Sequence, residues 1–132
     1  MQYLNDLGLL CTLGDSKQTV TDSLLGNSVP LPDPQALLSR QGQYTVGEVN
    51  APLSPLPEPL ARYECRNNRL AAAALDQIRP AIDAALQRYG SQRVAVVMAT
   101  STSGIVETER AVRSVNGDTG YPAGYHPVQG IL

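Results

Sequence analysis

The run of apolar residues at 93–100, RVAVVMAT, is the feature that most restricts how this chain folds. Its central residues carry no charge, are rich in β-branched Val, and have the length of a strand. Because apolar residues occupy both alternating sets of positions, the strand is predicted to be buried on both faces, as in the sheets of α/β proteins. The run therefore predicts a sheet covered by helices.

A second strand is expected at residues 3–12, where Leu7, Leu9 and Leu10 form the apolar part. Two predicted strands are fewer than a sheet of ordinary size contains. The predicted fold class is therefore α/β with an incomplete sheet, in a single truncated domain that covers 1–132.

A short helix is expected after this strand. Asp15 is the predicted N-cap, and Gln18 stands three residues later, as in a capping box. The helix is expected to run through Leu25. Gly26 and Asn27, which tolerate positive φ, are expected to end it.

The strongest helical pattern covers residues 68–89, where apolar side chains recur at spacings of three and four. Asn67 or Asn68 is the expected N-cap, and Gly90 stands where a residue with positive φ usually ends a helix. Pro80 removes one intrahelical hydrogen bond, so a kink or break is predicted there.

The loop 101–104 follows the apolar run, and another helix is predicted from about Ile105 to about Val115. Ser103 is its expected N-cap. Small hydroxyl residues before a helix can bind an anion through free amides, but the loop lacks the phosphate-binding loop pattern and contains no Lys. A turn that caps its helix is the favoured interpretation.

An irregular arm is predicted at about 29–60, which holds seven of the ten prolines. Prolines exclude long helices and central strands. Residues 44–49 alternate and predict a short edge strand or hairpin arm. The many Leu residues of the arm indicate that it packs against another surface.

Composition excludes several classes of function. The net charge is −2 and the pI is about 5.2, with no cluster of Lys and Arg for nucleic acid or an anionic membrane. No apolar run approaches the roughly 20 residues that span a bilayer. The first residues lack the basic start of a secretory signal. We expect a cytoplasmic protein with reduced thiols.

Candidate catalytic residues are few. His126 is the single histidine, and no motif ties a Ser or Cys to it. Cys11 fits a small buried side chain. Cys65 precedes the long helix, near several arginines, and is interpreted either as a reactive thiol or, preferably, as helix-entry packing. Asp76 and Asp83 indicate a solvated helix face. The residues themselves predict no metal site, no cofactor and no catalytic group.

Three stretches, residues 3–14, 62–70 and 93–104, resemble the amino-terminal part of β-ketoacyl-acyl carrier protein synthases. The branch that the chain resembles most is linked to bacterial fatty acid and aryl polyene pathways. The stretches correspond to the family's opening strand, the entry to its long helix, and the next core strand with its loop.

The resemblance implies the first part of a thiolase-like α/β/α fold. The family condenses an acyl group with a malonyl unit on acyl carrier protein, with loss of carbon dioxide. It uses a Cys at a strand-to-helix elbow, in an Ala-Cys-Ser/Thr pattern, and His residues that assist decarboxylation. This sequence lacks that pattern, so no catalytic residue is carried over. Thr102 corresponds to a residue that lines the acyl pocket, and no cofactor is implied.

Three hypotheses remain open. The chain is expected to be an inactive amino-terminal portion of a 3-oxoacyl-acyl carrier protein synthase, with acyl carrier protein as partner. Alternatively, it is a non-catalytic module that pairs with a full-length synthase or with a second copy of itself. A hydrolase that uses Cys65 or Ser103 is the least favoured. The first hypothesis also predicts exposed apolar surface on residues 93–100 and on the long helix.

Overall fold

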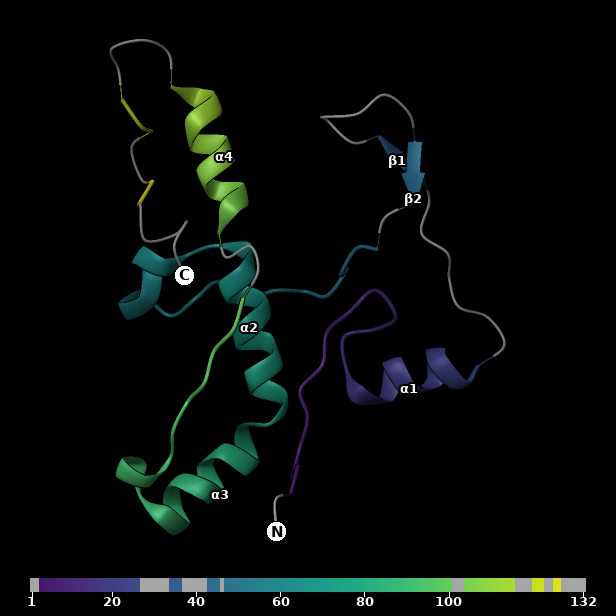
Figure 1. Cartoon of the computed structure of the whole chain (residues 1–132), viewed down its shortest axis with the longest axis vertical. Coiled ribbons are helices and arrows are strands. Elements are labelled where there is room, and N and C mark those ends of the chain that lie inside the picture. Colours follow the sequence, from purple (N-terminus) through teal and green to yellow (C-terminus); the bar gives the residue numbers. More distant parts are fainter. Residues whose placement is uncertain are drawn as a thin grey trace.

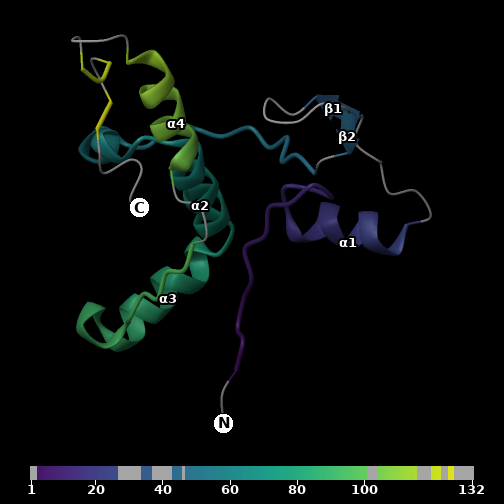
Figure 2. The same ribbon diagram turned by 45° about the horizontal axis from the view of Figure 1, so that its top comes forward.

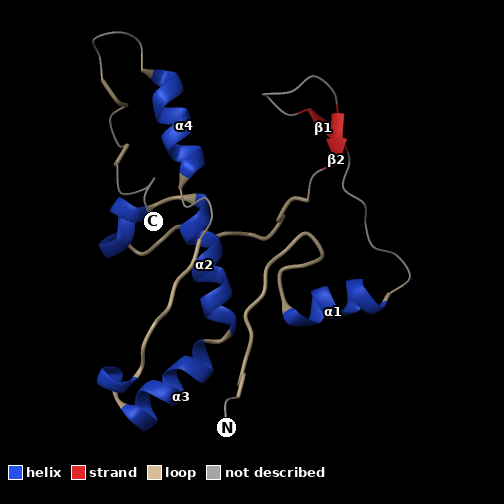
Figure 3. Ribbon diagram, viewed as in Figure 1, coloured by secondary structure: helices blue, strands red, loops and turns tan. Residues whose placement is uncertain are grey.

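A computed structural model describes residues 3–26, 34–36, 43–45, 47–100, 104–115, 120–122 and 125–126. Figures 1 and 3 show helices joined by long extended segments. The α-helices are α1 (Lys17–Leu25), α2 (Arg66–Gln77), α3 (Arg79–Tyr89) and α4 (Ile105–Ser114), the 3₁₀ helices are η1 (Glu58–Tyr63) and η2 (Ser91–Arg93), and the strands are β1 (Pro34–Ala36) and β2 (Gln43–Thr45).

The first helix, α1, begins one residue later than predicted. Ser16 is its N-cap, and its hydroxyl accepts a hydrogen bond from the Thr19 amide at 3.2 Å. The Thr19 hydroxyl accepts from the Ser16 amide at 3.1 Å, so Ser16 and Thr19 form the capping box. The prediction of Asp15 and Gln18 in these roles was wrong. Gly26 ends the helix, as predicted, with a φ of −77°.

The long helical pattern forms two helices, because Pro80 breaks it as predicted. Ile78 leaves the helical conformation between α2 and α3, and Pro80 lies in the first turn of α3, where a missing amide costs little. Gly90 ends α3 with a φ of +79°, which confirms the expected positive φ. The N-cap of α2 is Cys65, so the prediction of Asn67 or Asn68 was wrong.

The predicted arm contains the described strands. β1 and β2 form a two-stranded antiparallel hairpin in which Gln35 pairs with Tyr44. This confirms the hairpin at 44–45, whereas residues 47–50 are not in a strand. The later part of the arm, residues 51–60, lies against α2 and lines a groove with it.

The predicted strand at 3–12 was wrong. Residues 3–10 are extended, and an isolated bridge joins Cys11 to Gly14. The extended segment lies against the end of α2, where the Gln77 side chain takes the place of a strand neighbour. Its Oε1 accepts from the Leu9 amide at 3.1 Å, and its Nε2 donates to the carbonyl oxygens of Leu9 and Asp15, each at 3.0 Å.

The close approach of residues 3–10 to α2 requires a residue without a side chain at position 8. A Cβ on Gly8 would overlap the carbonyl oxygen of Ala74. Lys17 then ties the same segment to α1, because its Nζ lies 2.5 Å from the Asp6 carboxylate. The N-terminal segment therefore connects α1 to α2.

The predicted strand at 93–100 was also wrong, because no strand pairs with it among the described residues. Arg93 belongs to η2, and the residues after it are extended. Figures 1 and 2 show this segment running back beside α3 and α2 to reach α4. Val96, Val97 and Met98 are 79%, 92% and 70% exposed, so the predicted burial was wrong, whereas the exposed apolar surface expected of a portion of a synthase is confirmed.

The layered sheet of an α/β fold is not formed by the residues that the structure describes, and it stays a prediction. Within that part of the chain, the buried hydrophobic side chains are Val20, Cys65 and Ala111. Val20 lies in α1, Cys65 at the N-cap of α2 and Ala111 in α4.

Replacement of Gln77 by Leu tests how the N-terminal segment is held. The change removes three hydrogen bonds and leaves the Leu9 amide and two carbonyl oxygens without their partner, so we expect a loss of about 1–3 kcal/mol. Hydrogen exchange of the Leu9 amide should accelerate, and the urea midpoint should fall. The control is Gln87→Leu, at an exposed position of α3. Equal exchange rates in both variants would contradict this assignment.

Candidate functional site

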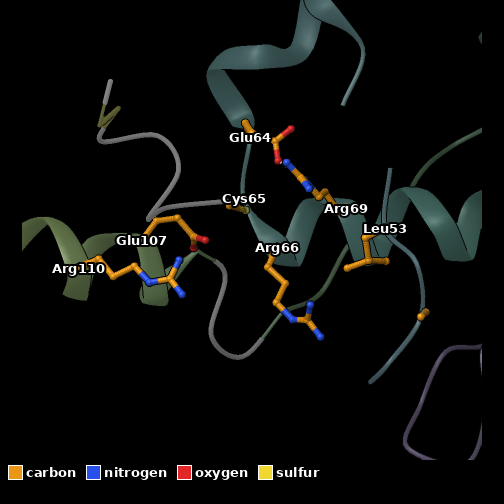
Figure 4. Close-up of a pocket in the computed structure, with 8 residues that line it drawn as sticks. Leu53, Glu64, Cys65, Arg66, Arg69, Glu107 and Arg110 are labelled. Atoms are coloured by element: carbon orange, nitrogen blue, oxygen red, sulfur yellow. The ribbon is translucent and has the colours of Figure 1, made fainter. Parts of the chain in front are cut away.

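A cleft of about 500 Å³ lies between the start of α2, the first turns of α4 and the end of the arm (Figure 4). Cys65, the candidate reactive thiol, lines this cleft. The lining residues are Ala51, Leu53, Glu64, Cys65, Arg66, Arg69, Glu107 and Arg110.

Cys65 is buried at this cleft, with 3% of its surface exposed. Its Sγ accepts a hydrogen bond from the Asn68 amide at 3.4 Å, so the sulfur caps α2. The Asn68 side chain donates in turn to the carbonyl oxygen of Tyr63 at 2.7 Å, which fixes the entry to the helix. The interpretation of Cys65 as helix-entry packing is confirmed by this geometry.

The arginines near Cys65 make contacts directed away from the sulfur. Arg66 donates to the carbonyl oxygen of Val49 at 2.6 Å. Arg69 forms an ion pair with Glu64. Arg62 lies over the ring of Tyr63, with 4.6 Å between the guanidinium carbon and the ring centroid. These side chains join the arm and η1 to α2, and the hypothesis that they surround a reactive thiol gains no support.

Glu64 is the acidic group at the centre of these contacts. Burial raises its pKa, but the Leu56 amide, which donates at 2.9 Å, and the Arg69 guanidinium outweigh that effect, so the pKa lies below its ordinary value of 4.5. A carboxylate held in its ionised form is unsuited to donate a proton near neutral pH. Glu64 is therefore a structural anion that joins the arm to α2.

The other candidate residues are not brought to the cleft. Thr102 and Ser103 lie outside the described residues, whereas Gly104 is buried and is the N-cap of α4. His126 is exposed, and Cys11 lines a separate cleft of about 180 Å³. No described pair of a thiol or hydroxyl with a histidine lines either cleft.

The two predicted acidic residues on the long helix are solvated, as expected. Asp76 is exposed and lies 2.8 Å from Arg79, one turn away. Asp83 is exposed on α3. Across the described ranges, no group of three or more His, Cys, Asp or Glu is placed to hold a metal ion.

Two cleft residues, Glu107 and Arg110, were missed by sequence reasoning. They lie three residues apart, one turn, and on α4 they face the start of α2 across the cleft. The spacing on a predicted helix was the available signal. It did not indicate that α4 returns to the start of α2, because the segment at 94–100 that brings it there was expected to be a strand inside a sheet.

No helix among the described residues has the length and apolar character needed to cross a membrane. No protein-family model matches the chain, and no curated protein matches it.

The chain is similar to a solved structure from Xenorhabdus doucetiae, the ketosynthase ApeO in complex with its chain length factor ApeC. The TM-score is 0.78 and the sequence identity is 34%, over 97% of this chain and 33% of the matched chain. The chain therefore spans about a third of the length of that relative.

The chain is ketosynthase-like, because both its sequence and the path of its backbone follow the matched chain over nearly its whole length. The match also supports a thiolase-like fold, although the layered sheet is not formed by the described residues.

The ionised Glu64 predicts a dependence of stability on pH. Its pKa is lower in the folded state than in the unfolded state, so its contribution is complete above about 4.5 and is lost as the pH falls through the folded value. We expect the urea midpoint to fall from about pH 6 to pH 3 more steeply in the unaltered chain than in Glu64→Gln.

The matched control is Glu58→Gln, at an exposed position of η1. This variant should keep the slope of the unaltered chain. A slope that is the same in all three proteins would contradict the role given to Glu64.

Proposed function

We propose that this chain is the amino-terminal portion of a 3-oxoacyl-acyl carrier protein synthase and that it is inactive by itself. The observation that carries the proposal is the match to the ApeO–ApeC complex, at 34% identity over 97% of this chain but 33% of the matched one. The match supports a ketosynthase-like condensing protein. The reaction and its substrates are part of the proposal.

The chemistry of the condensation shows why the cleft beside Cys65 cannot catalyse the reaction by itself. An acyl group is held as a thioester on a Cys, and malonyl-acyl carrier protein loses carbon dioxide to form an enolate. The enolate carbon attacks the thioester carbonyl, a carbon–carbon bond forms, and the thiol is released. These reaction steps require an accessible thiolate and proton donors for the enolate oxygen. Cys65 is buried and its sulfur caps α2, so it offers no access to an acyl donor.

The proposal extends to the carrier, the acyl pocket and the cellular compartment. Acyl carrier protein is the proposed carrier of both substrates. Thr102 is the proposed pocket residue, on the strength of the family resemblance. The two free cysteines are consistent with a reducing compartment, and we propose that the protein acts in the cytoplasm.

A second candidate function is a non-catalytic module that pairs with a full-length synthase. The observation that favours it is that the matched structure is a complex of a ketosynthase with a chain length factor. Two sets of exposed apolar side chains, on the segment 94–99 and on α4, are available for such pairing. The exposed members are Val96, Val97, Met98, Ile105, Val106 and Val112.

The first proposal predicts no turnover by the 132-residue chain. The purified chain is incubated with acyl- and malonyl-loaded carrier protein, and 3-oxoacyl product is measured by mass spectrometry against the same chain after heat denaturation. An active ketosynthase serves as the positive control. We expect no product above the denatured control, because no thiol is placed for the transfer. Sustained production of the 3-oxoacyl thioester would contradict the proposal.

The second candidate predicts a stable complex with a ketosynthase. Sedimentation velocity of the mixture should show a species heavier than either protein alone, and Val112→Lys, which introduces a charge on the exposed face of α4, should weaken it. The control is Leu25→Lys on α1. Two independently sedimenting species at all mixing ratios would exclude pairing.

A further inference from the structure

We draw no further inference here: the strongest candidate, the cationic side of the cleft between α2 and α4 that Arg66, Arg69 and Arg110 line, belongs to the site already described, and nothing in the structure shows what covers it in a chain that spans about a third of the matched ketosynthase.

Discussion

The docking of residues 3–10 onto the end of α2 is the contact on which the rest of the described arrangement depends. Gln77 supplies three hydrogen bonds to the backbone of this segment and its following turn, and Gly8 allows it to approach the Ala74 carbonyl. Because Lys17 ties the same segment to α1, the first helix is positioned through it. Among the described residues, no ion pair or side-chain hydrogen bond joins α1 to α2 directly, so the described polar contacts link the two helices through this segment.

A second constraint sets the relation between the helices. Pro80 divides the long helical pattern, and α3 therefore leaves α2 at a bend. The chain then turns at Gly90 and returns along both helices to α4, which completes the cleft beside Cys65. The cleft therefore depends on the bend between α2 and α3 and on the segment that leads from Gly90 back to α4. Its charged residues serve mainly to join the arm, η1 and α2, as Glu64 and Arg69 show.

Sequence patterns predicted the helices well, because their signals are local. The break at Pro80 and the end at Gly90 follow from the backbone chemistry of single residues. The caps were harder, since Asp15 and Ser16 are equally suitable and the choice depends on Thr19. The strands could not be predicted, because an apolar pattern indicates an extended segment but does not supply its neighbour. At 3–10 the neighbour is a Gln side chain, and at 94–99 the described residues provide none. The return of α4 to the start of α2 left no local signal either.

The account combines a ketosynthase-like backbone with a candidate thiol, Cys65, that is buried and caps α2. The most direct test is the intact mass of the chain after incubation with an acyl-loaded carrier protein, followed by location of any adduct. The account predicts an unchanged mass, because Cys65 is buried as a helix cap and Cys11 lies in a separate small cleft. A stoichiometric acyl thioester on Cys65 or Cys11, removed by hydroxylamine, would contradict it.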